Sequence, residues 1–413
     1  MEAINYWFSL KSHVYVEFKN CVMLLYNTQT GDTIEEYSKD AISLVMQMRE
    51  PDNLGVILYD EELQTNSEIH TFVQNVVERQ MGDLWKCMEG YQKPVRLYPF
   101  LNLQKDVDRL KKGEENNLIL GKDIINYLFE MNIYLNDFCN HKTCEYCKEY
   151  CKQIHCCTSN QTGTELSVNC FEKIFHQIKY SPIGKINLLG GNIFKYKNFI
   201  KIYDILESMK EIIHCYIHYK IYEKDKYINT FPLELIVSFP VDEISLKRVW
   251  SQIDRKNTSV QFIIENKVHY YEVKEWIRQF NLEKFDIHPF FSGKNLDFFK
   301  DNIFVGKEEI LSNTLQIWEI FRNQKLNSNF FGALYVLPDG TVKADMNTEA
   351  LGNLKETTIL DVIYKELIEN TAWRKVRDMY PCSDCIYQYI CPAPSNYEIS
   401  IGKPNLCHIN NDE

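Results

Sequence analysis

Residues 131–151, MNIYLNDFCNHKTCEYCKEYC, place a short strand directly before a loop with four cysteines. Positions 131–136 alternate apolar and polar residues, which is the pattern of a half-buried strand. The loop gathers thiols around one point at the end of this strand, while the neighbouring His141 and His155 are interpreted as solvated loop residues. The alternative, a loop of free thiols, is disfavoured because exposed thiols oxidise. The sequence therefore predicts a metal site with six candidate ligands: Cys139, Cys144, Cys147, Cys151, Cys156 and Cys157.

This strand is the first of six apolar runs that alternate with amphipathic, helix-like stretches. Repeated strand–helix units predict a parallel sheet, and six of them fit an open or partial barrel whose chemistry gathers at the carboxyl ends of the strands. The second run ends in Gly190-Gly191-Asn192, where a glycine pair lets a ligand approach the backbone, although such a pair is more often only a turn. The runs cover residues 133–135, 185–189, 215–219, 233–239, 260–265 and 285–291.

A second cysteine group, near the end of the sequence, begins with a C-x2-C pair and consists of Cys382, Cys385, Cys391 and Cys407. Four thiolates suit zinc or an iron–sulfur cluster, since both favour soft sulfur ligands. Four unligated thiols are the less favoured interpretation of this spacing. The scattered cysteines are interpreted as small core residues: Cys21, Cys87, Cys170 and Cys215.

Composition excludes several classes of protein. The chain has 413 residues, 45% of them apolar and 25% charged, which fits two or three globular domains. A net charge of −11 argues against nucleic acid as a partner, and the lack of a long apolar run argues against a membrane span. The first residues contain no secretory signal, so a cytoplasmic location with reduced thiols is expected.

Four segments are predicted along the chain. Residues 1–95 form a small α+β module with a winged-helix-like arrangement, in which Ser67 caps the helix that follows it. Residues 96–125 are a polar connector, 126–320 hold the six strand–helix units, and 321–413 hold the second cysteine group.

Together these features resemble radical S-adenosylmethionine (SAM) proteins with a SPASM domain, which act in the maturation of ribosomally made peptides (RiPPs). The ending Cys391-Pro-Ala-Pro-Ser-Asn-Tyr-Glu398 is similar to that of the pseudo-radical-SAM proteins of GG-Bacteroidales-type peptide systems. The resemblance implies an α/β fold with a partial (β/α)6 radical-SAM-type barrel, an N-terminal leader-recognition module and a C-terminal SPASM-like metal-binding domain. It also implies two partners, a precursor peptide with its leader and an active radical SAM maturase.

The motif that activates SAM in this family is altered in the present sequence. The family has C-x3-C-x2-C, whereas Cys139, Cys144 and Cys147 are spaced C-x4-C-x2-C, with Tyr146 as the family's aromatic residue. The family's Gly-Gly-Glu, which contacts SAM, corresponds here to the cofactor-binding candidates Gly190, Gly191 and Asn192. Loss of that carboxylate costs about 1.5–3 kcal/mol, or about ten- to a hundredfold in affinity. A further ligand from Cys151, Cys156 or Cys157 would close the cluster to SAM.

The SPASM resemblance is also selective. The ligands of its second cluster are all present at Cys382, Cys385, Cys391 and Cys407, which predicts a 4Fe–4S cluster there, with zinc as the alternative. The first cluster would need cysteines within 324–331 and at the positions of Asp345 and Ser395, and it has none. A further cluster is predicted in the 139–157 loop.

Three hypotheses follow from these patterns. The first is an accessory iron–sulfur protein of peptide maturation that binds a leader peptide or a partner maturase. The second is an active radical SAM peptide-modifying enzyme with a non-standard cluster loop. The third is a zinc-stapled binding protein.

Overall fold

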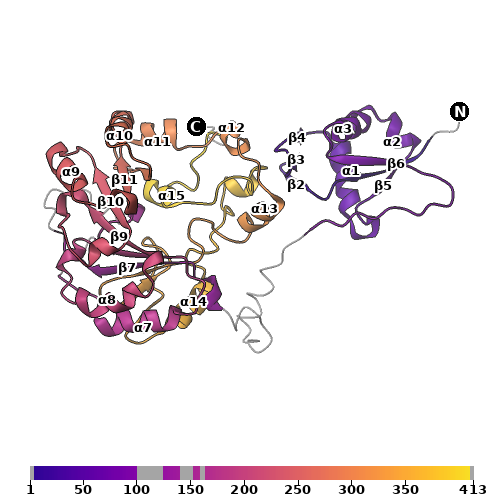
Figure 1. Cartoon of the computed structure of the whole chain (residues 1–413). Helices are drawn as coiled ribbons and strands as arrows, with labels where there is room; N and C mark the ends of the chain where they lie inside the picture. Colours follow the sequence, from indigo (N-terminus) through magenta and orange to yellow (C-terminus); the bar gives the residue numbers. More distant parts are fainter. Residues whose placement is uncertain (1–3, 100–123, 140–151, 159–162, 410–413) are drawn as a thin grey trace.

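A computed structural model of the chain describes residues 4–99, 124–139, 152–158 and 163–409. The protein is mixed α/β, with a small N-terminal unit beside a larger unit that holds a nine-stranded sheet (Figure 1). Four predicted site residues, Tyr146, Cys144, Cys147 and Cys151, lie outside the described residues, as does most of the predicted connector. No helix in the described part of the chain is long and apolar enough to cross a bilayer.

The large sheet has the order β12-β11-β10-β9-β8-β7-β13-β14-β15 and is mostly parallel. Each of the six predicted runs overlaps one of the strands β7 to β12, so the prediction of a parallel α/β sheet is confirmed. Closure of the sheet into a partial barrel stays a prediction. The strands are β7 (Glu130–Asn136), β8 (Lys185–Gly190), β9 (Ile213–His218), β10 (Leu233–Ser238), β11 (Thr258–Ile264), β12 (Phe285–Pro289), β13 (Ala333–Val336), β14 (Thr341–Lys343) and β15 (Gly352–Asn353).

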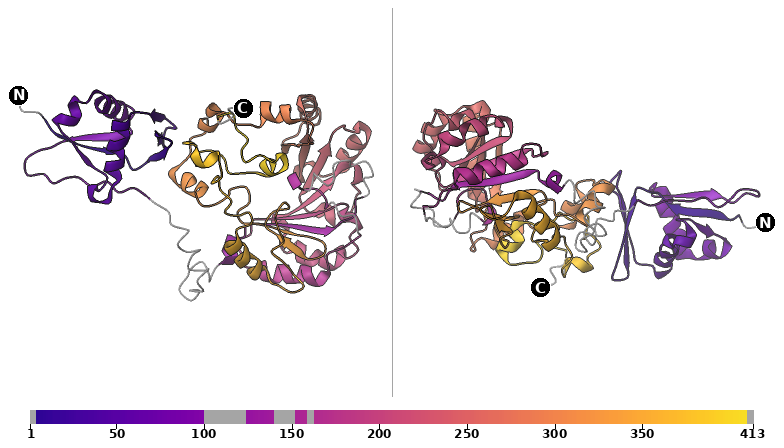
Figure 2. Two further views of the ribbon diagram at one scale, coloured as in Figure 1. Left: turned by 180° about the vertical axis from the view of Figure 1, so that it is seen from behind. Right: turned by 90° about the horizontal axis from the view of Figure 1, so that it is seen from below.

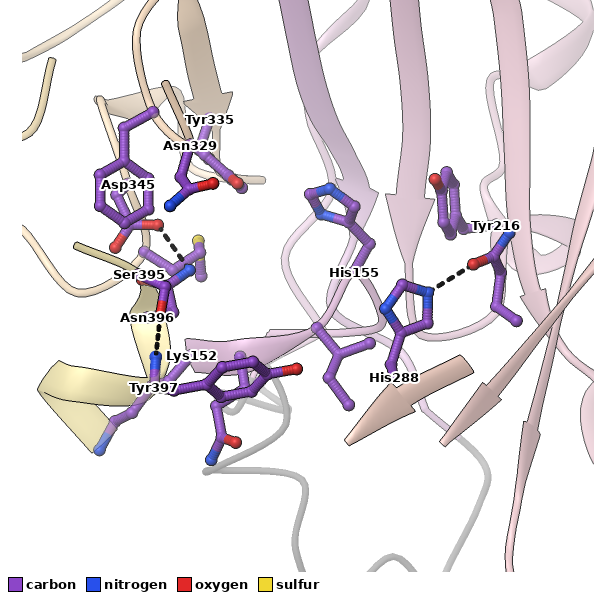
Figure 3. A pocket seen from close by; sticks show the side chains of 15 residues that line it. Lys152, His155, Tyr216, His288, Asn329, Tyr335, Asp345, Ser395, Asn396 and Tyr397 are labelled. Carbon is purple, nitrogen blue, oxygen red and sulfur yellow. Dashed lines mark hydrogen bonds between the residues drawn. The ribbon is translucent and has the colours of Figure 1, made fainter. Parts of the chain in front are cut away.

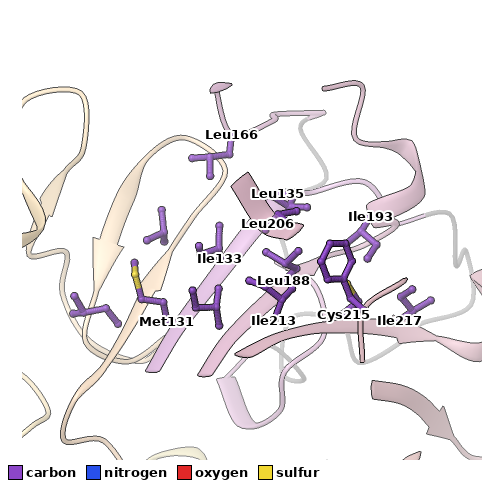
Figure 4. Packing of buried hydrophobic residues seen from close by; sticks show 14 of the residues in the cluster. Met131, Ile133, Leu135, Leu166, Leu188, Ile193, Leu206, Ile213, Cys215 and Ile217 are labelled. Atoms are coloured by element: carbon purple, nitrogen blue, oxygen red, sulfur yellow. The ribbon is translucent and has the colours of Figure 1, made fainter. Parts of the chain in front are cut away.

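The two faces of this sheet differ in chemistry. Along each parallel strand, alternate residues such as Ile133, Leu188 and Phe262 pack in the main apolar core with the helices (Figure 4). The residues between them, such as Asn132 and Asn187, face the other way and are buried and polar. We call this second side the inner face.

The helices of the larger unit begin at identifiable caps. Ser167, Asp242 and Asn266 each accept a backbone N–H from the first turn of α7, α9 and α10, respectively. The helices are α7 (Val168–Ile178), α8 (Phe199–Glu207), α9 (Glu243–Trp250), α10 (Lys267–Phe280), α11 (Leu296–Asn302), α12 (Lys307–Leu311), α13 (Ile317–Asn323), α14 (Ile359–Glu369) and α15 (Asn396–Ile401).

The N-terminal unit contains two three-stranded sheets, β5-β1-β6 and β2-β3-β4, around its own apolar core. Its strands are β1 (Tyr6–Leu10), β2 (Val14–Lys19), β3 (Val22–Asn27), β4 (Thr33–Glu36), β5 (Ile57–Tyr59) and β6 (Gly82–Lys86). Its helices are α1 (Lys39–Arg49), α2 (Glu61–Thr65) and α3 (Ser67–Glu78). The domain boundaries inferred from the sequence stay predictions.

Two predictions in this unit are wrong. Asn66, not Ser67, caps α3, because the Asn66 side chain accepts the N–H groups of Glu68 and Ile69. Cys21 is exposed rather than buried, because it forms the β2–β3 hairpin turn with Asn20, and both residues have positive φ.

Among the other scattered cysteines, Cys87 is only half-buried, so its assignment to the core is also wrong. Cys170 and Cys215 are buried, as predicted.

The β2-β3-β4 sheet lies between the N-terminal core and the larger unit. Tyr15, Leu24 and Tyr26 form one apolar cluster with Tyr387 and Ile390. In Figure 2 this end of the N-terminal unit lies beside the segment that holds α12 and α13.

Polar contacts reinforce this docking. The Tyr26 hydroxyl accepts the Leu315 N–H at 2.8 Å, and the Glu35 carboxylate binds both the Tyr387 hydroxyl and the Lys307 ammonium. The N-terminal unit therefore docks on the loop that carries the second cysteine group.

Candidate functional site

The second cysteine group surrounds one small cavity. Cys382 begins a 3-10 turn (Cys382–Asp384) that ends at Cys385, Cys391 follows in the next loop, and Cys407 lies after α15. All four line a cavity of about 20 Å³. Burial, opposed by the Arg377 guanidinium and assisted by the neighbouring cysteine thiols, raises the pKa of Cys391 to about 12. The structure therefore brings together the four residues that the sequence predicts as one site.

A buried cation and an amide stand next to these thiols. The Arg377 guanidinium lies 3.9 Å from the Cys382 sulfur and 2.8 Å from the Glu398 carboxylate. Burial would lower the pKa of Arg377, but Cys391 and Glu398 outweigh it and raise that pKa. Asn405 donates its amide N–H to the Cys407 sulfur at 3.1 Å. Positive charge and N–H donors around sulfur stabilise thiolates, which are the form that binds metal.

The four cysteine thiols are chemically suited to a four-thiolate metal site, but they are not already arranged around an ion. No group of three or more His, Cys, Asp or Glu side chains within the described ranges is placed to hold a metal ion. Metal binding would draw the four sulfur atoms together and release their protons. The cavity is about the size needed for one ordered water, so a single ion fits more readily than a four-iron cluster.

Hydrogen-bonded polar side chains lie at and around the positions where the family's other SPASM cluster would be held. Asp345 accepts N–H groups from Asn347 at 3.0 Å and from Asn396 at 3.2 Å. Asn329 binds the carbonyls of Ala393 and Pro394. Asp345 and Ser395 therefore lie together, as the resemblance implies, and polar side chains connect the segments that a cluster would otherwise join.

At the carboxyl edge of the large sheet, the glycine pair is in contact with the start of the first cysteine loop. A Cβ on Gly191 would lie 1.8 Å from the Phe138 carbonyl oxygen and 2.5 Å from the Cys139 nitrogen. Gly190 has a φ of +136°, which favours glycine. The glycine pair is therefore closely approached by the backbone of Phe138 and Cys139 rather than by a ligand. Cys139 and the pair are brought together, but as packing partners.

Asn192 is committed to the same local structure. Its side chain is 2% exposed and accepts the Phe194 N–H at 3.0 Å, while its carbonyl accepts an N–H from Asn136 at 2.8 Å. The side chain therefore caps the short turn after β8. It is not among the residues that line the cavity of about 400 Å³ on the inner face of the sheet.

Residues 152–157, which we call the covering segment, pack against the inner face. Ile154 and Cys156 join an apolar cluster with residues from five parallel strands, namely Tyr134, Leu189, Tyr216, Ile236 and Ile263. Gln153 exchanges two hydrogen bonds with the Phe291 backbone, at 2.9 and 3.0 Å, and Asn347 binds the Lys152 carbonyl at 2.8 Å. The segment is thus tied at two places and covers the centre of the sheet.

The inner face beneath it carries a network of hydrogen-bonded polar groups around Gln261. The Gln261 amide donates to Glu234 at 2.7 Å and to Asp286 at 3.0 Å, and its oxygen contacts His288 at 2.6 Å. Burial would raise the pKa of Glu234, but hydrogen bonds from His214 and Gln261 hold it below its usual value. These groups satisfy one another, as buried polar side chains need to in order not to destabilise a fold. On the same face, the Asn132 amide nitrogen and the Asn187 amide oxygen are buried and have no hydrogen-bond partner among the described residues.

A cavity of about 400 Å³ remains between the covering segment, the inner face and α15 (Figure 3). His155 and His288 lie on its sheet side, whereas Asp345, Asn396 and Tyr397 lie on the other. The cavity is open to a small polar ligand.

His155 is not the solvated loop residue that the sequence suggests. Its ring lies 5.4 Å from that of Tyr216 and 5.9 Å from that of Tyr335, and its Nε2 lies 3.7 Å from the Glu130 carboxylate. Burial lowers the pKa of His155 from 6.5 to about 4, because the attraction of Glu130 does not make up for lost hydration. The imidazole is therefore neutral at pH 7.

This shift predicts acid sensitivity. Between the two pKa values the unfolded chain binds more protons at His155 than the folded chain, so stability falls as the pH falls from 6.5 towards 4. We expect the unfolding free energy of the wild type to fall between pH 7 and pH 5, with about 2 kcal/mol of this fall due to His155. The His155→Gln variant lacks this contribution, so its unfolding free energy should fall by that much less. Urea unfolding at both pH values measures this. The exposed His176→Gln is the control, and equal pH dependence in wild type and His155→Gln would refute the assignment.

Several of these residues were not found from the sequence. The covering segment contains His155, Cys156 and Cys157, but nothing in its sequence indicates that it packs on the sheet, and Arg377 and Glu398 become a pair only in the folded chain. The inner face did leave a signal, because Asn132, Asn187 and Glu234 interrupt runs that are otherwise apolar. Such single polar residues at alternate positions mark a strand whose two faces differ.

Comparison with known proteins gives little more. No family model matches the chain, and no curated protein matches it. Among solved structures, "Crystal structure of Streptococcus suis SuiB" aligns with 97% of this chain and 99% of that chain, at 12% sequence identity and a TM-score of 0.45. Similarity at this level establishes neither a shared fold nor a shared function.

Proposed function

We propose that the chain is an accessory metal protein of ribosomal-peptide maturation that neither binds nor cleaves SAM productively. Its C-terminal four-thiol site would hold a metal centre at Cys382, Cys385, Cys391 and Cys407: a 4Fe–4S cluster, which the family resemblance implies, or a zinc ion. Its winged-helix-like N-terminal unit would bind the leader of a precursor peptide and bring it to an active maturase. The carboxyl edge of the sheet would serve as scaffold rather than as a catalytic centre.

One observation carries the accessory role: the places where a cofactor would bind are taken up by the chain itself. Backbone atoms of Phe138 and Cys139 close over Gly191, and the Asn192 side chain is used as a cap. The covering segment fills the centre of the inner face. A cofactor that bound at the glycine pair would have to displace these contacts, and the cavity of about 400 Å³ beside the covering segment is the space that the inner face leaves open.

Equilibrium dialysis with radiolabelled SAM tests this proposal. The anaerobically reconstituted protein is expected to retain a certain background amount of radiolabelled SAM. This amount should be no larger than the amount retained when a large excess of unlabelled SAM competes for the same protein. Saturable retention near one SAM per chain would favour the alternative of an active radical SAM maturase. The Asn192→Glu variant serves as a matched sample, because it restores the carboxylate of the family motif but leaves the packing over Gly191.

A zinc-stapled binding protein is a second candidate function. The cavity of about 20 Å³ between the four thiols favours it, because a single ion needs less room than a four-iron cluster. The chemistry of a four-thiolate zinc site is structural, with all coordination positions closed. Counts of iron, acid-labile sulfide and zinc after anaerobic purification separate the two: iron with matching sulfide supports the cluster, and zinc alone supports the second candidate.

A further inference from the structure

The cavity of about 400 Å³ on the inner face has a hydrogen-bond acceptor on each of two sides. His288 lies on its sheet side, and Asp345, from the loop after β14, lies on the opposite side (Figure 3). Aromatic rings of Tyr216, Tyr335 and Phe330 also line the cavity. A space of this size, with apolar walls and a few polar groups, is typical of sites for small organic molecules.

The network around Gln261 determines which nitrogen of His288 can accept a hydrogen bond. The Gln261 amide nitrogen donates to the carboxylates of Glu234 and Asp286, so its oxygen is left to face His288. The His288 Nε2–H therefore donates to that oxygen, at 2.6 Å. Burial, opposed by the nearby carboxylates of Asp286 and Glu234, lowers the pKa of His288 below 6.5, so the ring is neutral at pH 7.

The other nitrogen of this ring is an unused acceptor. In a neutral imidazole whose Nε2 carries the proton, Nδ1 carries a lone pair. The His288 Nδ1 has no hydrogen-bond partner among the residues that the structure describes. A ligand with an N–H donor would satisfy it.

Asp345 is a buried carboxylate that has hydrogen bonds but no opposite charge. Its side chain is 1% exposed and accepts amide N–H groups from Asn347 at 3.0 Å and from Asn396 at 3.2 Å. Within the described ranges it forms no ion pair. Burial raises the pKa of the Tyr335 hydroxyl, and the charges of Asp345 and Glu130 raise it further. A buried charge is costly unless it is paired, so a cation in the cavity would stabilise Asp345.

Further carboxylates lie behind the sheet-side wall. The Glu130 carboxylate lies 3.7 Å from the His155 Nε2, and Glu234 and Asp286 both bind Gln261. With Asp345, four carboxylates therefore act on the cavity. Their summed field favours a ligand that carries positive charge.

The cations near the cavity balance only part of this charge. The Lys185 ammonium donates to the Tyr216 hydroxyl at 3.3 Å and lies 5.8 Å from the centre of that ring, and His214 is paired with Glu234. Lys152 also lines the cavity, but it is exposed, so solvent and salt screen its charge. The aromatic walls add to the preference, because ring faces attract ammonium groups and accommodate the methylene groups of an alkyl chain.

We infer that a short aliphatic diamine, protonated at both ends, binds in this cavity, with one ammonium donating to the His288 Nδ1 and the other paired with Asp345. This inference goes beyond the proposed function, since it involves neither the four-thiol site nor a leader peptide. It gives the inner face a small-molecule ligand of its own.

Isothermal titration calorimetry of the full chain with 1,4-diaminobutane, in an amine-free buffer of low ionic strength, tests the inference. We expect saturable binding of about one diamine per chain. The single-charge analogue n-butylamine should bind about tenfold more weakly or worse, because it lacks one charge-assisted hydrogen bond. The uncharged analogue 1,4-butanediol has the same length and should give no measurable binding.

Two variants and a matched control locate the site. Asp345→Asn and His288→Leu are each expected to weaken diamine binding about tenfold or more. Asp301→Asn removes an exposed carboxylate of the same charge on α11, 3.4 Å from the Lys267 ammonium, and should leave binding within about twofold. Thermal melts show whether each variant folds. If Asp345→Asn does not fold, His288→Leu and the three ligands decide the question.

The inference is wrong if the diamine does not bind saturably, if 1,4-butanediol binds as well, or if Asp301→Asn weakens binding as much as Asp345→Asn. Equal binding of Nα-acetyllysine methylamide would assign the cavity to a peptide side chain instead of a free diamine. Displacement of the diamine by an equal concentration of SAM would assign the cavity to that cofactor and would contradict the proposed accessory function as well. The other outcomes leave the proposed function untouched.

Discussion

The Cys391→Ser variant is expected to lose its bound metal and to loosen the docking of the N-terminal unit. Cys391 is 9% exposed and is both a wall of the four-thiol cavity and a member of the apolar cluster that holds Tyr15 and Tyr26. Serine keeps the shape but is a poor ligand for soft metals. Because structural metal binding contributes directly to folding, the unfolding free energy should fall by more than about 4 kcal/mol.

Two measurements check this prediction. Elemental analysis gives the metal content per chain, and limited proteolysis compares how readily the N-terminal unit is released. The control is Cys170→Ser. Cys170 lies on α7 and is also buried, at 4% exposure, but it is far in sequence from the residues that line the four-thiol cavity. Cys170→Ser should retain all of its metal. A Cys391→Ser protein with the full metal content would show that the four thiols do not form one site.

The second large effect concerns the glycine pair. Gly191→Ala is expected to destabilise the protein by about 3 kcal/mol or more, because the added Cβ meets backbone atoms of Phe138 that no side-chain rotation can move. Gly184→Ala is the matched control, since no atom lies within 4 Å of its added Cβ. The control should change stability by less than about 0.5 kcal/mol. Urea unfolding curves of the three proteins provide the comparison.

The result separates two functions of the pair. If the glycines serve mainly to let the chain pack on itself, Gly191→Ala loses stability whether or not any cofactor is present. Equal stability of Gly191→Ala and Gly184→Ala would mean that the space above Gly191 is open, as a ligand site requires. The accessory role would then lose its main support.

The parallel sheet could be predicted from the sequence because strand–helix alternation is a local pattern. The apolar runs mark strands, and several of the stretches between them, such as residues 197–211 and 243–253, have helical periodicity, although only short 3-10 turns connect β9 to β10. The four-thiol site could be predicted for a similar reason, since the C-x2-C spacing is set by a tight turn. Cys382 and Cys385 do lie on such a turn, and Cys391 and Cys407 line the same cavity.

The contacts that give the candidate site its character could not be predicted, because they join residues far apart in the chain. Gln153 binds Phe291, and Glu35 binds Tyr387. No local spacing encodes either pair. His155 illustrates the consequence: a histidine in a cysteine-rich loop suggests solvent, yet tertiary packing places it against Tyr216 and lowers its pKa. The resemblance to a catalytic family likewise does not indicate that the chain covers its own inner face.

The most direct test of the account is the release of 5′-deoxyadenosine by the protein after anaerobic iron–sulfur reconstitution, with SAM and a strong reductant. The account predicts no release above a control without protein, even when the iron and sulfide counts show a complete cluster at the four-thiol site. Release that exceeds the control, and that the Cys139→Ser variant abolishes, would contradict the central claim that the chain's own backbone and side chains occupy the place of the cofactor.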